Sequence, residues 1–74
     1  MKLDRIKDLR EDRDLKQTEI ATLLKISQAQ YSRIENGLNE ITLDSLIRLA
    51  KFYHTSSDYI LGLTNEKKPY EMKK

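Results

Sequence analysis

The chain has 74 residues, a length that fits one domain at most, and its small core would bury only about 60% of the surface that the unfolded chain exposes. It has no cysteine and one histidine, His54, which excludes disulfides and thiolate metal sites and offers no cluster of metal ligands of the histidine and cysteine type. The formal net charge is +2, but residues 1–65 carry ten basic and ten acidic side chains, so the excess lies in residues 66–74 and does not by itself indicate nucleic-acid binding.

The first dozen residues alternate charges with Leu3, Ile6 and Leu9. They therefore contain no apolar stretch for a signal peptide or a membrane span. We expect a cytoplasmic protein.

Apolar residues recur at helical spacing and never at the alternating spacing of a strand, which predicts an all-α fold with four or five short helices. The first helix is expected from about Leu3 to Asp12, where the polar pair Arg13-Asp14 follows. The second is expected from about Gln17 to Leu24.

The third helix has the clearest start, because Ser27 and Gln30 have the spacing of a capping box, in which each side chain satisfies a backbone donor of the other. Gly37 is a suitable left-handed residue after its end. Thr42 is expected to cap a fourth helix, from Leu43 to Tyr53.

A fifth, short helix is expected from Asp58 to Leu61, opened by Ser56 or Ser57 and stopped by Gly62. Beyond Leu63 the apolar pattern disappears. Residues 1–63 are therefore predicted to form the domain and residues 64–74 a flexible, charged tail.

The second and third helices are joined by three residues, Lys25 to Ser27, and their inward positions can share one core. These positions are Ile20, Ala21, Leu24, Ile26, Tyr31 and Ile34. On the opposite side of the third helix, an arc of about 140° carries Gln28, Ala29, Ser32 and Arg33. Glutamine can pair with adenine, arginine with guanine, and an alanine methyl with the thymine methyl, so this arc suits the major groove of DNA.

Five segments carry a family resemblance: L-K-Q-T-E-I-A (15–21), I-S (26–27), Y-S-R-I-E-N-G (31–37), L-I-R-L-A-K (46–51) and S-D-Y-I-L-G (57–62). Together they resemble the phage repressor and Cro type of helix-turn-helix domain, the Xre family. The resemblance implies a compact, five-helix, lambda-repressor-like fold and a transcriptional regulator, typically a repressor, that binds palindromic operator DNA as a homodimer through the helix from Ser27 to Asn36.

The resemblance also implies that Gln17 contacts a phosphate and supports Gln28, and that the backbone near Asn36 meets phosphate. Lys16 lies at a helix N-terminus, where phosphate is favoured, although an exposed lysine is more often simply solvated. Ser27, at the start of the third helix, completes this expected phosphate-positioning group.

Arg10 and Glu35 resemble a family ion pair that ties the first helix to the recognition helix. Three positions depart from the family pattern, since Asp14, Lys25 and His54 occupy places where glycine is usual after a helix. A left-handed lysine should cost about 1 kcal/mol. Glu40, in the loop after the third helix, would oppose phosphate, so this loop is not expected to contact the DNA backbone.

Tyr59, Ile60 and Leu63 are candidates for the dimer contact, although apolar residues at this spacing are as often part of the core. The alternative function is an antitoxin-like protein-interaction module, with the tail folding on a partner around Tyr70 and Met72. No nucleophile with a base, paired carboxylates in a cleft or phosphate-binding glycine loop can be assembled, so neither enzyme activity nor a cofactor is expected.

Overall fold

The computed structural model describes residues 3–67, and within them the chain forms five helices and no strand. The predicted all-α, five-helix fold is therefore confirmed, and each predicted helix end lies within one residue of the observed one. The helices are α1 (Asp4–Asp12), α2 (Gln17–Leu24), α3 (Gln28–Glu35), α4 (Leu43–Phe52) and α5 (Ser57–Ile60).

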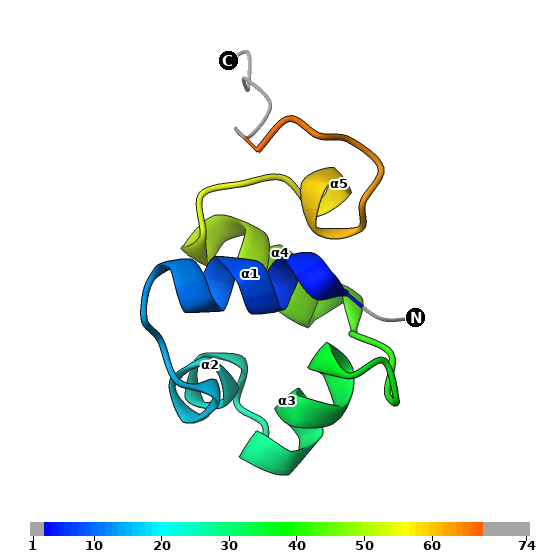
Figure 1. Ribbon diagram of the computed structural model, residues 1–74. Helices are drawn as coiled ribbons and strands as arrows, with labels where there is room; N and C mark the ends of the chain where they lie inside the picture. The colour runs from blue at the N-terminus through cyan, green and yellow to red at the C-terminus, as the bar shows by residue number, and fades with distance from the viewer. Residues whose placement is uncertain (1–2, 68–74) are drawn as a thin grey trace.

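The helices form a short stack with α2 and α3 at one end, α5 at the other, and α1 and α4 between them (Figure 1). Helix α2 packs on α3, α4 packs on α5, and α1 contacts both α3 and α5. Helix α1 thus joins the α2–α3 unit to α5, and the outer side of α3 is left exposed. No helix within residues 3–67 is long and apolar enough to cross a membrane.

One apolar core holds these elements together, and every helix contributes to it. The inward positions predicted for α2 and α3 are all buried except Ile26, which is partly buried and packs against the core. The buried apolar residues are Leu3, Ile6, Leu9, Ile20, Ala21, Leu24, Tyr31, Ile34, Leu46, Leu49, Tyr53 and Ile60.

All five helices end in the same way, with a residue of positive φ just beyond the last turn. At the end of α2, for example, Lys25 has a φ of 59°; its N–H donates to the carbonyl of Thr22 at 3.2 Å and the N–H of Ile26 donates to that of Ala21 at 3.0 Å. These bonds satisfy carbonyl groups that the helix leaves free. The positive-φ residues are Asp14, Lys25, Gly37, His54 and Gly62, so the left-handed geometry expected at the three non-glycine positions is confirmed.

The first residues of the tail lie against the body of the domain. The Arg5 guanidinium donates to the carbonyl oxygens of Tyr59, at 2.9 Å, and of Thr64. The Thr55 hydroxyl donates to the carbonyl of Lys67. Residues 64–67 are therefore attached to α1 and to the turn that precedes α5.

The tail positions expected to meet a partner protein, Tyr70 and Met72, lie outside the described residues. A tail-mediated partner therefore stays a prediction.

Candidate nucleic-acid interface

The start of α3 is fixed by the predicted capping box. The hydroxyl of Ser27 accepts from the backbone N–H of Gln30 at 3.1 Å, and the side-chain oxygen of Gln30 accepts from the N–H of Ser27 at 3.0 Å. These bonds satisfy two backbone donors and fix the residue at which α3 begins. They also occupy the Ser27 hydroxyl, so a phosphate that binds this residue would compete with the cap or use the backbone.

The outer arc of α3 faces solvent. Gln28, Ala29 and Arg33 are exposed and Ser32 is partly buried, whereas Tyr31 and Ile34 on the opposite side are buried in the core. The guanidinium of Arg33 forms no hydrogen bond or ion pair with any residue between 3 and 67. This face therefore presents the guanidinium of Arg33, the side-chain amide of Gln28 and the methyl group of Ala29 to solvent. Base edges in the major groove can pair with all three groups.

Asn36 is exposed at the C-terminal end of α3, and its side-chain N–H donates to the Ser32 hydroxyl oxygen at 3.4 Å. The backbone then turns through Gly37, whose φ is 76°. Asn36 thus lies at the edge of the outer arc, but its backbone N–H already donates to the Ser32 carbonyl at 3.0 Å, so the phosphate contact predicted there would compete with that bond.

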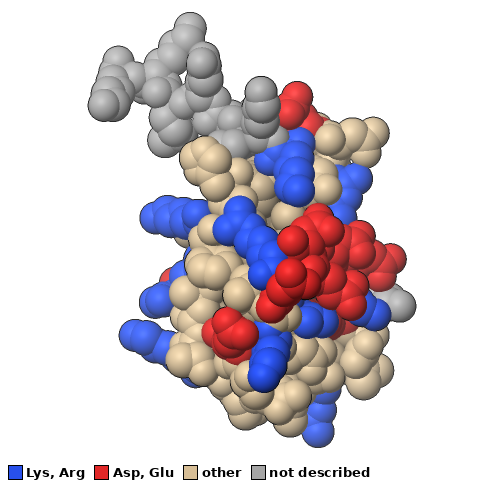
Figure 2. Space-filling model, turned by 60° about the vertical axis from the view of Figure 1, so that its left-hand side comes forward, with Lys and Arg blue, Asp and Glu red and all other residues tan. Residues whose placement is uncertain are grey.

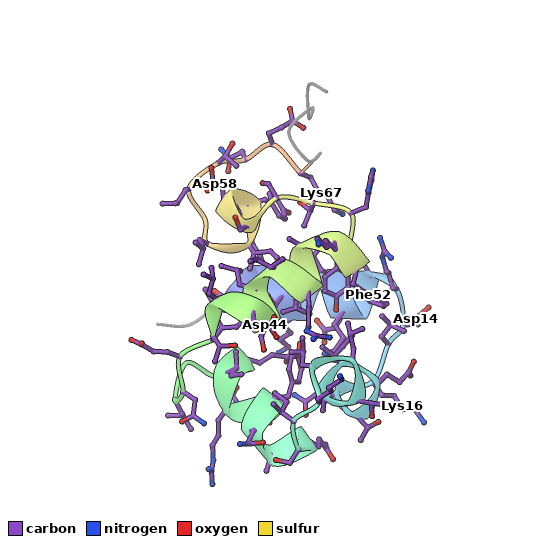
Figure 3. The ribbon with its side chains drawn as sticks, turned by 180° about the vertical axis from the view of Figure 1, so that it is seen from behind. Asp14, Lys16, Asp44, Phe52, Asp58 and Lys67 are labelled. Atoms are coloured by element: carbon purple, nitrogen blue, oxygen red, sulfur yellow. The ribbon has the colours of Figure 1, made fainter. Side chains whose placement is uncertain are left out.

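Lys16 is exposed at the N-cap position of α2, at the opposite end of the molecule from Lys67 and Asp58 near α5 (Figure 3). The first N–H groups of a helix have no acceptor inside it and favour an anion. Sequence reasoning missed the acid beside them: the Glu19 carboxylate accepts from the Lys16 N–H at 3.2 Å. The K-x-x-E spacing, half of a capping box, is the signal that could have predicted this bond.

The predicted ion pair between α1 and the end of α3 is present. Arg10 Nε lies 2.7 Å from Glu35 Oε2 and Arg10 Nη2 lies 3.2 Å from Glu35 Oε1, a two-pronged arrangement. The side chains are 12% and 3% exposed. Arg10 also donates to the carbonyl of Leu15 at 2.9 Å, so one guanidinium joins three parts of the chain.

Opposing influences act on the Glu35 carboxyl. Burial, the largest single influence, raises its pKa, but interactions with Arg10, Tyr31 and Gln17 together outweigh burial and hold the pKa below its ordinary value. The hydrogen bond to Glu35 in turn raises the pKa of Arg10. Glu35 is therefore a buried carboxylate that remains ionised at neutral pH.

Gln17 links this carboxylate to the outer arc. Its Nε2 donates to Glu35 Oε1 at 3.2 Å, and its Oε1 accepts from Gln28 Nε2 at 3.5 Å. The contact between Gln17 and Gln28 was expected from the family resemblance, whereas the bond to Glu35 was not. Since the two residues are 18 positions apart on different helices, no local pattern could have predicted it.

Two tyrosine hydroxyls are buried near the same carboxylate. Within residues 3–67 neither the Tyr31 nor the Tyr53 hydroxyl has a hydrogen-bond partner. Burial raises the pKa of both phenols, that of Tyr53 to about 12. The buried Tyr53 hydroxyl therefore destabilises the core without compensation, whereas the Tyr31 hydroxyl interacts with the Glu35 carboxylate.

The face in Figure 2 has no dominant basic surface. Most of its acidic side chains gather in one large cluster, a few lie apart from it, and the basic side chains are scattered rather than joined in a band. Any recognition of DNA must therefore depend strongly on the geometry of α3, because the general electrostatic attraction is weak.

Among the described residues no group of three or more potential ligands could hold a metal ion.

The three candidate dimer residues have different surroundings. Ile60 is 1% exposed and belongs to the core of its own chain, and Tyr59 is partly buried beneath the Arg5 guanidinium, 4.2 Å from the ring centre. Leu63 is 73% exposed. Of the three, Leu63 alone has a large accessible apolar surface.

A helix-turn-helix family model matches residues 6–60 of the chain. Similar proteins include the uncharacterized HTH-type transcriptional regulator YobD of Bacillus subtilis, 35% identical over 93% of this chain, and the HTH-type transcriptional regulator AnsR of the same organism, 33% identical over 90%. The transcriptional repressor RstR of a cryptic phage in Vibrio cholerae is 39% identical over 66%. The chain spans 62%, 58% and 44% of these relatives' lengths. No solved structure gives a significant match.

Proposed function

Since this chain belongs to the helix-turn-helix family of transcriptional regulators, we propose that it is a repressor that binds palindromic operator DNA as a homodimer. The observation that carries the proposal is the outer arc of α3, which is solvent-facing and held by the capping box at one end and the Arg10–Glu35 pair at the other. A rigid helix with an open polar face is what major-groove reading requires.

In this proposal α3 lies in the major groove and its outer arc reads bases. Arg33 pairs with guanine and Gln28 with adenine, while Ala29 and Ser32 contact thymine methyl groups or nearby base edges. The unengaged guanidinium of Arg33 supports its role, because no interaction within residues 3–67 must be broken when it meets a base.

A second group positions the protein on the phosphates. Lys16 and Gln17 at the start of α2, Ser27 at the start of α3 and Asn36 at its end would contact the backbone on either side of the groove. Glu19 weakens phosphate binding at the N-terminus of α2, because a carboxylate one turn along the helix repels phosphate. We therefore expect the exposed Lys16 side chain to contribute more to phosphate binding than the N-terminus of the helix does.

Repression is supported by a relative named as a phage transcriptional repressor. For the homodimer, the exposed side chain of Leu63 offers apolar surface beyond α5, and Tyr59 can extend it at the edge. A two-fold dimer would set two copies of α3 about 34 Å apart, in successive major grooves.

Selection of bound duplexes from random DNA tests this function. We expect enrichment of a site with two inverted half-sites whose centres lie about 10 base pairs apart. A protein with both Gln28→Ala and Arg33→Ala is the matched control, since both side chains are exposed and their removal leaves the core intact. Recovery of a single, non-symmetric half-site would contradict the dimer, and no enrichment over the control would contradict sequence-specific binding.

A further inference from the structure

Three side chains connect the buried ion pair to the outer arc of α3. Glu35 is 3% exposed, Gln17 is partly buried and Gln28 is exposed, and consecutive members are joined by hydrogen bonds of 3.2 and 3.5 Å. The series therefore begins at a fixed charge inside the protein and ends at a group that meets solvent or a ligand.

The chemistry of the first member fixes the direction of every bond in the series. An ionised carboxylate can only accept hydrogen bonds, so Gln17 must turn its NH₂ group toward Glu35. The carbonyl oxygen of Gln17 is then the atom left for Gln28, which must turn its own NH₂ group toward it. Neither glutamine is free to exchange its nitrogen and oxygen positions without losing a bond.

This order decides what Gln28 can offer to a base. One N–H is used by Gln17, so one N–H and the carbonyl oxygen remain. Adenine presents an acceptor, N7, and a donor, N6, in the major groove, and these match that pair. Guanine presents two acceptors, N7 and O6, and would match the opposite arrangement, in which the Gln28 oxygen is used internally and both N–H groups face outward.

We propose that Glu35 is a positioning residue for base specificity: acting through Gln17, its carboxylate holds the Gln28 amide in the orientation that selects adenine over guanine. The inference rests on the proposed function, in that Gln28 must meet a base. It assigns Glu35 a part in recognition although its side chain is buried and touches no DNA.

The variant Glu35→Gln tests the inference because an amide of the same shape can donate as well as accept, so the direction of the series is no longer fixed. A good bidentate contact gives a discrimination of roughly 5- to 150-fold between bases. We expect the adenine-over-guanine preference at the base pair read by Gln28 to fall to within about threefold of unity, while the preference at the pair read by Arg33 is retained. Competition titrations with single-base variants of the selected site measure both.

Three further variants separate positioning from folding. Arg10→Met breaks the ion pair but leaves a carboxylate to accept from Gln17, so at pH 8 it should lower stability and keep the adenine preference. Gln17→Leu interrupts the series and removes one donor from Glu35 Oε1 while both Arg10–Glu35 bonds can remain, and it should lose the preference as Glu35→Gln does. If Glu35→Gln is not folded by circular dichroism at the titration temperature, the double variant Arg10→Met with Glu35→Met removes the same carboxylate without leaving a buried charge unpaired, and it should lose the preference as well.

Full adenine preference in Gln17→Leu, or in a folded Glu35→Gln, would overturn the inference while leaving DNA binding by α3 intact. An unchanged preference in Gln28→Ala would instead overturn base reading by Gln28, and the inference with it. The two failures are therefore distinguishable in one set of titrations.

Discussion

The Arg10–Glu35 pair should make a large, non-additive contribution to the free energy of unfolding. Arg10→Met leaves a carboxylate that is 3% exposed with one remaining side-chain hydrogen bond, from Gln17 at 3.2 Å. Breaking a buried pair costs about 3–5 kcal/mol, and the remaining bond reduces this to about 2–4 kcal/mol. Glu35→Met should cost less, about 1–3 kcal/mol, because Arg10 keeps its bond to Leu15 and its 12% exposure lets it reach water.

The double variant replaces both charges with apolar groups of similar length, and its loss should be smaller than the two single losses together by about 2 kcal/mol. Urea unfolding at pH 7, followed by far-ultraviolet circular dichroism, measures all four proteins. The exposed pair Asp44–Arg48, with a 3.0 Å contact and exposures of 79% and 41%, is the matched control. Its coupling should be no more than about 0.5 kcal/mol. Equal coupling in the two pairs, or strictly additive losses at Arg10 and Glu35, would refute the reasoning.

Four further predictions concern stability. Because Lys25 has a φ of 59°, Lys25→Gly should leave the free energy of unfolding unchanged or raise it by up to about 1 kcal/mol, and clear destabilisation in urea would contradict a strained turn. Tyr53→Phe removes a buried hydroxyl that has no partner within residues 3–67, so stability should be kept or raised by up to about 1 kcal/mol; a loss above that size would mean that the hydroxyl is satisfied. The pKa of Glu35 is lowered in the folded chain, so the ionised carboxylate stabilises the fold above the unfolded pKa of 4.5. This stabilisation is lost as the pH falls through the folded pKa, and Glu35→Gln should not show the loss. The pKa of Tyr53 is raised to about 12, so the free energy of unfolding should fall as the pH rises from 10 to about 12. Tyr53→Phe should make the free energy of unfolding less dependent on pH in this range.

The helix bounds could be predicted from the sequence because their signals are local. The Ser27 and Gln30 pair, the Thr42 cap and the helix-ending residues each act within a few positions of the backbone they stabilise. The left-handed Lys25 was predicted instead from the family resemblance, because glycine is usual at that position after a helix. Helical periodicity also identified which faces of α2 and α3 enter the core.

Tertiary contacts were predictable only where the family resemblance supplied them. It supplied Arg10 with Glu35, but not the bond from Gln17 to Glu35, because two side chains on different helices leave no pattern in the sequence. Apolar spacing likewise could not distinguish Ile60, which is buried, from Leu63, which is exposed. That difference depends on how α5 packs against α1 and α4.

The most direct test of base reading by α3 compares Arg33→Ala with Lys16→Ala on the selected site, its single-base variants and several salt concentrations. Arg33→Ala should cost roughly 1–3 kcal/mol on the preferred site and flatten discrimination at one base pair, as loss of a bidentate guanine contact requires. Gln28→Ala should do the same at a neighbouring pair. Lys16→Ala should weaken all duplexes about equally and reduce the salt slope by about one unit, because it removes a phosphate contact alone. If Arg33→Ala weakened every sequence alike and left the base preference intact, α3 would not read bases through that residue and the account would be contradicted.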